Sequence, residues 1–333
     1  MKAVMSRTPG GPETLTLEDV PEPVAKKGEV LIAIKACSVN YPDVLIIEDK
    51  YQLKPPRPFA PGAEVAGVVE SVGEGVTQAK VGDRVIAFPM VGGFAEKVAV
   101  GTATLIPMPD VMTFEDGASL ILTYATSLHA LKDRAKLQAG ETLLVLGAGG
   151  GVGIAAVELG KAMGARVIAA ASSQEKVDLA IAHGADAGVV YPKGPFDKDG
   201  LRALTERFKA ACGAKGADVI YDPVGGDYAE AALRAIAWEG RFLVVGFPAG
   251  IPKIPLNLTL LKGCQIVGVF WGGFVNNQPQ DAVANTRELL NLYVEGKIRP
   301  EVSERFPLER GGEAIARLAS RQARGKIVVI PNG

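Results

Sequence analysis

The sequence contains few of the residues that build disulfide frameworks and zinc sites. Among 333 residues there are three cysteines, Cys37, Cys212 and Cys264, and two histidines. The thiols form no Cys-x-x-Cys pair, a distribution that fits neither a disulfide scaffold nor a structural zinc site. We therefore expect the cysteines to be small core residues of a protein in a reducing compartment.

The chain also lacks an excess of charge and a long apolar run. Its formal net charge is -1 and its pI is about 6.2, so it has no long-range attraction for nucleic acid or for an anionic membrane. The longest uncharged apolar stretch, residues 143–157, is rich in glycine and shorter than the ~20 residues that span a bilayer. The opening residues, MKAVMSRTPGG, show no signal-peptide pattern. These features predict a cytoplasmic protein that binds neither nucleic acid nor membranes.

Two kinds of sequence pattern divide the chain. Residues 1–115 are rich in glycine and proline, with short β-type runs between turn signals, which predicts an antiparallel, barrel-like domain. From residue 116 onward, short apolar strands alternate with helices, which predicts a parallel sheet covered on both faces. The pattern does not decide whether the last sixty residues, two amphipathic helices and a strand at 326–330, extend that sheet or return to the first domain.

The most informative stretch runs from Leu143 to Gly153, with the sequence LLVLGAGGGVG. It reads as a buried strand, a glycine turn and a helix. Strict Gly-x-Gly-x-x-Gly spacing fails by one position, and the best frame is Ala148-x-Gly150-x-x-Gly153. Such a loop lets backbone N–H groups approach a pyrophosphate at the positive end of the helix. The alternative is a merely flexible turn, but the strand–turn–helix context favours a dinucleotide. The predicted contacts are Gly149, Gly150, Gly151, Val152 and Gly153.

The end of the second strand indicates which dinucleotide binds. Sites that prefer NAD place an Asp or Glu there to bind the ribose hydroxyls. This strand instead ends in Ala169-Ala-Ala-Ser-Ser173, and no acid would repel a 2′-phosphate. Ser172, Ser173 and Lys176 offer two hydroxyls and a cation, so we expect NADP(H). Ser172-x-x-Glu175 also has the form of a helix capping box, and the two roles can coexist.

Beside the glycine loop, six further motifs are recognisable: Val39-Asn-Tyr-Pro-Asp43, Pro61-Gly-Ala-Glu-Val-Ala-Gly67, Val81-Gly-Asp-Arg-Val85, Gly92-Gly-Phe-Ala-Glu96, Tyr221-Asp-Pro-Val-Gly225 and Gly240-Arg-Phe-Leu-Val-Val-Gly246. With these motifs the sequence resembles the medium-chain dehydrogenase/reductase superfamily over essentially its whole length. Within that superfamily, the resemblance is to the zinc-independent NADPH:quinone oxidoreductase and enoyl reductase branch.

The resemblance implies an α/β protein with two domains. A GroES-like β-barrel catalytic domain would comprise residues 1–122 and 272–333. A Rossmann domain, a doubly wound parallel sheet that binds NADP(H), would comprise residues 123–271, and the nicotinamide would lie in the cleft. Relatives commonly pair the edge strand that ends near Phe270 across a two-fold axis, so we expect a homodimer.

The resemblance also indicates whether the protein binds a catalytic zinc ion. Alcohol dehydrogenases of the superfamily hold catalytic zinc with a Cys and a His, and the corresponding positions here are Asn40 and Ala63, although Glu64 remains. We therefore expect no metal. Without a Lewis acid, the feasible acceptor is one that delocalises its own developing charge, such as a quinone or an α,β-unsaturated carbonyl.

Several further site residues follow from the resemblance. Tyr51 would bond the enolate oxygen of the acceptor or deliver a proton; alternatively its ring stacks on Pro55 or Pro56. Asn40 and Tyr41 would line the floor near the nicotinamide ribose, where Asn40 could equally be a structural amide. The resemblance also places four residues near the cofactor, of which Thr126 could instead serve packing and Arg321 could be solvated: Thr126, Lys176, Tyr191 and Arg321. Five more follow strand ends, where open α/β sheets bind their ligands: Val224, Gly246, Phe247, Phe270 and Trp271. Phe270 and Trp271 could equally be core or interface aromatics.

The sequence thus predicts an NADPH:quinone oxidoreductase. A 2-enoyl thioester or enone reductase shares every motif and is the alternative. A non-catalytic relative that binds a nucleotide or RNA is a third possibility, against which the near-neutral charge counts.

Overall fold

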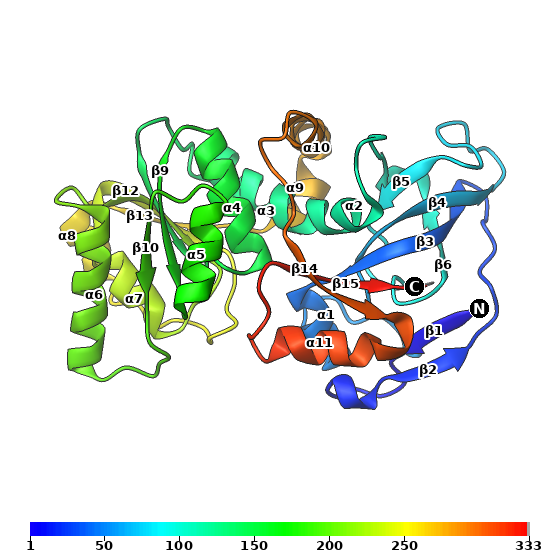
Figure 1. Ribbon diagram of the computed structural model, residues 1–333, viewed down its shortest axis with the longest axis horizontal. Helices are drawn as coiled ribbons and strands as arrows, with labels where there is room; N and C mark the ends of the chain where they lie inside the picture. Colours follow the sequence, from blue (N-terminus) through cyan, green and yellow to red (C-terminus); the bar gives the residue numbers. More distant parts are fainter. Residues whose placement is uncertain (332–333) are drawn as a thin grey trace. The chain divides into compact units, whose positions relative to one another are not determined.

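The computed structural model describes residues 1–331 and divides into two compact units. Unit 1 contains Met1–Leu122 and the residues from Pro300 onward, and unit 2 contains Thr123–Arg299. Figure 1 shows the elements of both units. The expected class is confirmed: unit 1 is built mainly from antiparallel strands, and unit 2 from a parallel sheet flanked by helices.

Unit 1 holds a seven-stranded sheet with the order β14-β15-β3-β4-β5-β7, in which β6 also pairs with β3. A separate hairpin joins β1 to β2. The strands are β1 Lys2–Met5, β2 Thr16–Asp19, β3 Glu29–Val39, β4 Glu64–Val72, β5 Arg84–Ala87, β6 Lys97–Gly101, β7 Leu105–Pro107, β14 Val302–Pro307 and β15 Lys326–Ile330. Its helices are α1 Tyr41–Ile47, α2 Phe114–Leu120 and α11 Gly311–Ala319. Because β15 pairs antiparallel with β3, the last segment returns to the first domain.

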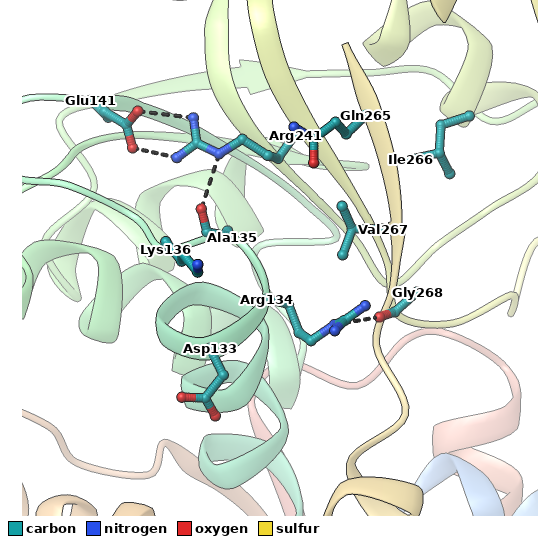
Figure 2. Close-up of a pocket in the computed structure, with 10 residues that line it drawn as sticks. All are labelled: Asp133, Arg134, Ala135, Lys136, Glu141, Arg241, Gln265, Ile266, Val267 and Gly268. Carbon is teal, nitrogen blue, oxygen red and sulfur yellow. Dashed lines mark hydrogen bonds and ion pairs between the residues drawn. The ribbon is translucent and has the colours of Figure 1, made fainter.

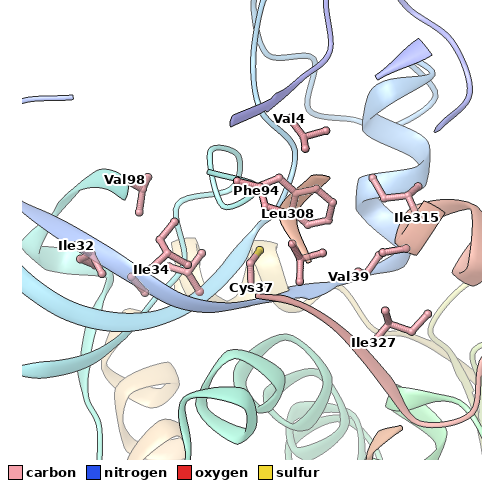
Figure 3. Close-up of a cluster of buried hydrophobic side chains, with 14 of the residues drawn as sticks. Val4, Ile32, Ile34, Cys37, Val39, Phe94, Val98, Leu308, Ile315 and Ile327 are labelled. Atoms are coloured by element: carbon pink, nitrogen blue, oxygen red, sulfur yellow. The ribbon is translucent and has the colours of Figure 1, made fainter. Parts of the chain in front are cut away.

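The core of unit 1 forms where alternate residues of β3 meet the C-terminal segment. Ile32 and Ile34 point from β3 into this cluster, and Phe94 lies between Val4 and Leu308 (Figure 3). Burial of such side chains stabilises the fold by about 1.5–3 kcal/mol each. This cluster holds the last segment against strands that lie more than two hundred residues earlier in the chain.

Unit 2 contains a six-stranded parallel sheet with the order β10-β9-β8-β11-β12-β13. The strands are β8 Thr142–Leu146, β9 Arg166–Ala171, β10 Ala187–Val190, β11 Ala217–Asp222, β12 Ile236–Val244 and β13 Gln265–Gly268. Counted from β8, this is the 3-2-1-4-5-6 order of the Rossmann fold, whose direction reverses between β8 and β11. Ligands of such sheets bind at that reversal, beyond the carboxyl ends of the strands.

Helices cover the parallel sheet of unit 2. Right-handed crossovers put α4 and α5 on one face and α6 and α7 on the other, and each pair lies together in Figure 1. The helices are α3 Thr126–Leu128, α4 Gly151–Ala162, α5 Gln174–Ala182, α6 Lys198–Cys212, α7 Asp227–Leu233, α8 Asn257–Lys262, α9 Trp271–Asn277 and α10 Pro279–Val294. Two π-helical segments, Ile121–Ala125 and His129–Arg134, flank α3.

The second boundary between the units differs from the expected one. Residues 272–299, which the resemblance places in the catalytic domain, pack within unit 2. Phe274 of α9 stacks on His129 with ring centroids 4.0 Å apart. In α10, Asn285 Nδ2 donates to Asp133 at 2.8 Å, and Glu288 accepts from Lys132 at 2.5 Å. These contacts place the boundary at Arg299.

No helix among residues 1–331 combines the length and the apolar character that crossing a membrane requires.

Candidate functional site

A glycine loop, residues 147–153, connects the end of β8 to α4. Gly147 has a φ of 60°, in the left-handed region that favours glycine. A Cβ on Gly153 would lie 2.7 Å from the Cα of Ala148 and closer still to the carbonyl oxygen of Gly147. Only glycine therefore lets α4 begin this close to β8.

The first turn of α4 is suited to an anion. Gly150 is the N-cap, and the turn that follows contains Gly151, Val152 and Gly153 and no acidic residue. The N–H groups of a first helical turn have no partner within the helix and point at the positive end of its dipole. Because side chains are absent at most of these positions, a diphosphate can approach the backbone directly. The loop therefore fits a dinucleotide.

The residues after β9 lie beside this loop. A Cβ on Gly149 would come within 2.6 Å of the Cβ of Lys176, so the lysine stem packs against the glycine backbone. Ser173 is the N-cap of α5, and its Oγ accepts from Lys176 N at 3.4 Å. The cap is thus Ser173, and the capping box that we considered for Ser172 is wrong by one residue. Ser172 is exposed at the end of β9.

A buried carboxylate shapes the turn after β11. Asp222 is 3% exposed, and its Oδ1 accepts from the N–H groups of Val224 at 2.8 Å and Gly225 at 2.9 Å. Burial raises the pKa of Asp222 to about 6, and these two hydrogen bonds oppose the shift. Asp222 belongs to the predicted motif Tyr221-Asp-Pro-Val-Gly225 but was not among the predicted site residues, although an acid at the end of an apolar strand is a visible signal.

The other predicted residues of unit 2 follow strand ends. Val224 is close enough to the glycine loop that a Cβ on Gly147 would lie 2.8 Å from its Cγ2. A Cβ on Gly225 would lie 3.2 Å from Phe247, and Gly246 N donates to Asp222 O at 3.3 Å. The glycine loop, Lys176, the β11 turn and Phe247 therefore form one continuous edge, which we call the nucleotide half-site.

Four further predicted residues of unit 2 lie at the ends of strands and at the starts of helices. The ring of Tyr191 packs in the core, 4.8 Å from that of Tyr228, and is 5% exposed. Phe270 is 64% exposed, Trp271 begins α9, and Thr126 begins α3.

In unit 1, the predicted Asn40 belongs to a group of buried polar residues that we call the Asn40 cluster: Ser38, Asn40, Asp43, Glu64 and Lys326. Asn40 is the N-cap of α1 and is 4% exposed. Its Oδ1 accepts from Lys326 Nζ at 2.6 Å, and its Nδ2 donates to Ser38 Oγ at 2.9 Å. Both ends of this amide therefore have structural partners.

The charged members of the Asn40 cluster are deeply buried. Glu64 Oε2 accepts from Ser38 Oγ at 2.7 Å, and its Oε1 accepts from Leu122 N at 2.9 Å. Lys326 Nζ lies 3.8 Å from Glu64 Oε2, and burial lowers the pKa of Lys326 while Glu64 opposes that shift. Glu64 stands in a predicted motif, whereas Lys326 was not predicted; its one signal in the sequence is an ionisable residue at the start of an apolar strand.

Asp43 closes the first turn of α1. It accepts from Asn40 N at 2.7 Å and from Gly62 N at 3.0 Å, and burial raises its pKa to about 6. Tyr51 is half-buried in the loop after α1, and burial, followed by the charge of Asp43, raises the pKa of its phenol. Tyr51 consequently stays protonated through neutral pH, as a proton donor must. Tyr41 is the first residue of α1.

Arg321 lies outside this cluster. It is exposed, follows α11 and has a φ of 59°. Among residues 1–331, no group of three or more His, Cys, Asp or Glu side chains has an arrangement that could hold a metal ion.

Unit 2 also has a polar pocket of about 620 Å³ that contains none of the predicted site residues. The pocket runs along β13 and the segment before β8 (Figure 2). In its lining, Arg241 forms a bidentate ion pair with Glu141. Arg134 Nε donates to the carbonyl oxygen of Gly268 at 3.0 Å.

Two family models match the chain. One, described as alcohol dehydrogenase GroES-like domain, covers residues 26–110, and the other, described as zinc-binding dehydrogenase, covers residues 151–288. Quinone oxidoreductase-like protein 2 of Rattus norvegicus is 36% identical over 323 residues, which are 95% of this chain and 89% of that protein. The chain belongs to the quinone oxidoreductase family.

Further comparisons agree with this family membership. Quinone oxidoreductase of Rattus norvegicus is 34% identical over 317 residues, 94% of this chain and 92% of that protein. The crystal structure of Escherichia coli quinone oxidoreductase complexed with NADPH has a TM-score of 0.90 and 26% identity, and the match covers 99% of this chain and 100% of that one. The family is the branch that the sequence motifs indicated.

The raised pKa of Asp222 predicts a pH-dependent stability. Its carboxyl binds a proton more tightly in the folded state, near pH 6, than in the unfolded state, so this stabilisation is complete below about pH 4 and is lost as the pH rises through 6. Asp222→Asn keeps an oxygen acceptor for both N–H groups and carries no charge. We expect the variant to gain up to about 3 kcal/mol over the wild type between pH 4 and pH 8, measured by urea unfolding. A difference that is the same at both pH values would contradict this assignment.

Proposed function

We propose that this protein is an NADPH-dependent reductase that transfers a hydride to a quinone without using a metal. The observation that carries the proposal is the glycine loop, where a Cβ on Gly149 or Gly153 would occupy the space between backbone and neighbour. It lies at the direction reversal of a Rossmann sheet, as a dinucleotide site requires. The relative from Escherichia coli, which has the same fold, was solved with NADPH.

The preference for NADPH is assigned to the residues after β9. Ser172 is exposed there, Lys176 packs beside the loop, and the strand ends in alanines and serines instead of an acid. A hydroxyl and an ammonium are suitable donors to a 2′-phosphate. The second hydroxyl, that of Ser173, already accepts a bond from Lys176 N and can still donate one.

The proposed acceptor is a quinone because unit 1 offers a proton donor in place of a Lewis acid. NADPH supplies a hydride, and one hydride with one proton converts a quinone into a hydroquinone. We assign that proton to the Tyr51 hydroxyl, whose raised pKa keeps it in the donor form. Ala63 has no ligand atom and the Asn40 amide is bonded to Lys326 and Ser38, so neither position supplies a metal ligand.

We further propose that the protein is a homodimer that pairs through β13. Among residues 1–331, β12 is the one strand that pairs with β13, and the other edge of β13 is free of strand pairing, although Arg134 donates to its Gly268 carbonyl oxygen. Large apolar side chains are exposed on β13 and on the segments next to it: Trp238, Leu260, Leu261, Ile266 and Phe270. A second β13 would satisfy the backbone groups and cover these side chains together.

The first test concerns the cofactor. Lys176→Met keeps the apolar stem that packs on Gly149 and removes the ammonium. We expect Kd for NADPH to rise at least about tenfold, the loss of one charge-assisted hydrogen bond, while Kd for NADH changes little. Fluorescence titration measures both constants, and Lys209→Met on α6 is the control. An equal loss for NADPH and NADH would rule out a phosphate contact at Lys176.

The second test concerns the acceptor and Tyr51. We expect NADPH oxidation to be faster with 1,4-benzoquinone than with a crotonyl thioester, and Tyr51→Phe to lower kcat about 10²-fold with KM for NADPH unchanged. Phenylalanine keeps the ring, so a purely stacking role on the neighbouring prolines would leave kcat as it is. Turnover of the thioester alone would make the enzyme an enoyl reductase instead.

The third test concerns the dimer. Light scattering should give twice the chain mass of 34.8 kDa, and the double variant Leu260→Glu, Leu261→Glu should give the chain mass. Val24→Glu is the control, because Val24 is 78% exposed in unit 1 and should leave the dimer intact. A wild-type protein with the mass of one chain would refute pairing through β13.

A further inference from the structure

The polar pocket along β13 contains charged groups that the proposed reaction does not use. Its volume of about 620 Å³ lies within the range of sites that hold small molecules. Three cations and two acids are among its lining residues: Arg134, Lys136, Arg241, Asp133 and Glu141. All of them belong to unit 2, so the pocket is formed within a single unit.

Both acids and one of the cations already have partners. The carboxylate of Glu141 accepts from Arg241 at 2.9 and 2.6 Å, one bond to each oxygen. Asp133 Oδ2 lies 2.8 Å from His129 Nδ1 and accepts from Asn285 Nδ2 at 2.8 Å. Figure 2 shows the Asp133 carboxylate directed away from β13. The other two cations of the lining are therefore the ones that can face a ligand.

The first of these cations, Arg134, is held in one orientation by β13. Its Nε donates to the carbonyl oxygen of Gly268 at 3.0 Å, and Figure 2 shows the side chain reaching toward that strand. Within residues 1–331 this is the one hydrogen bond of the guanidinium, so both Nη groups lack a partner. Two Nη groups form a planar fork that matches two oxygens of a carboxylate or a phosphate. The fork is thus oriented before a ligand arrives.

The second cation, Lys136, occupies a backbone position that favours glycine. It follows the π-helical segment His129–Arg134 and its C-cap, Ala135, and has a φ of 51°. This left-handed conformation lets Leu137 N donate back to Leu131 O at 2.9 Å, which closes the end of the helix. Glycine adopts the conformation without steric cost, whereas a lysine does not. The end of the helix alone therefore does not explain a lysine at this position.

We propose that this pocket binds a small oxyanion with two negative charges, a dicarboxylate or a phosphate, through the fork of Arg134 and the ammonium of Lys136. The ammonium has no ion pair in the described part of the chain. Gln265 is exposed at the start of β13 and adds an amide that can donate to a further oxygen. All three side chains come from one chain, so the site requires neither the proposed dimer nor the proposed NADPH site.

The test is a calorimetric titration of the NADPH-saturated protein with succinate and, separately, with inorganic phosphate. At about pH 8 both probes are dianions, and bound NADPH keeps them out of the nucleotide half-site. Two charge-assisted contacts predict saturable binding with a Kd of about 1 mM that weakens as sodium chloride is added. Binding of either probe supports the proposal and shows whether the two charges lie on one group or on two. If neither probe binds saturably, the proposal is wrong.

Lys136→Gly separates a ligand contact from a structural role. The variant removes the ammonium and relieves the left-handed conformation, so its melting temperature should equal or exceed that of the wild type. We expect Kd for the probe that binds to rise about tenfold, the loss of one charge-assisted hydrogen bond. The control is Lys198→Met, which removes an exposed cation of α6 and should leave Kd unchanged. A lower melting temperature with an unchanged Kd would show that the lysine serves the helix end, and it would overturn the inference.

Arg134→Met is a second variant that leaves Lys136 in place and remains available if the glycine variant does not fold. It removes the fork, and we expect Kd for the same probe to rise at least about tenfold. An unchanged Kd would exclude Arg134 from the site and refute the proposed fork. Because the titration can be repeated without NADPH, failure of the proposed function would leave this comparison of variants intact.

Discussion

The close approach of α4 to the end of β8 is the constraint on which the nucleotide half-site depends. Three glycines of the loop are required by three different neighbours: Gly147 faces Val224, Gly149 faces Lys176 and Gly153 faces Ala148. The glycines at 147 and 149 therefore let the β11 turn and the stem of Lys176 approach the loop, and Gly153 lets the loop pack against the start of α4. The N–H groups of the first turn of α4 gain their exposure to a ligand from this arrangement, since any side chain would stand between them and a diphosphate.

Unit 1 depends in a comparable way on one buried carboxylate. Glu64 accepts from Ser38 through one oxygen and from Leu122 N through the other. Leu122 lies in the π-helical segment Ile121–Ala125, and a side chain that enters a helix ladder is a known cause of such local widening. Glu64 thereby joins β4 to the π-helical segment Ile121–Ala125. The ammonium of Lys326 then makes the burial of this carboxylate tolerable.

Local sequence signals predicted the parts of the structure that depend on neighbours in the chain. The strand–glycine–helix pattern placed the loop correctly, and apolar runs predicted the parallel strands of unit 2, because burial and turn chemistry are visible in short windows. Four strands of unit 1, β1, β2, β7 and β14, were not predicted. These local signals did not predict contacts between residues far apart in the sequence. The boundary at Arg299 depends on Phe274 meeting His129 and on Asn285 meeting Asp133, pairs about 150 residues apart. Similarly, nothing in the sequence around Asn40 shows that Lys326 lies 2.6 Å away.

The charge balance of the Asn40 cluster connects this architecture with the proposed chemistry. Lys326 and Glu64 neutralise each other, and Asp43, with its pKa raised to about 6, is close to neutral under mildly acidic conditions. At neutral pH the cluster therefore holds about one uncompensated negative charge, that of Asp43, and Ala63 offers no ligand atom. In the proposed reaction, the acceptor spreads its developing charge over its own conjugated system and takes a proton from a neutral donor. A quinone meets the first condition, and the phenol of Tyr51 is suited to the second because burial keeps it protonated.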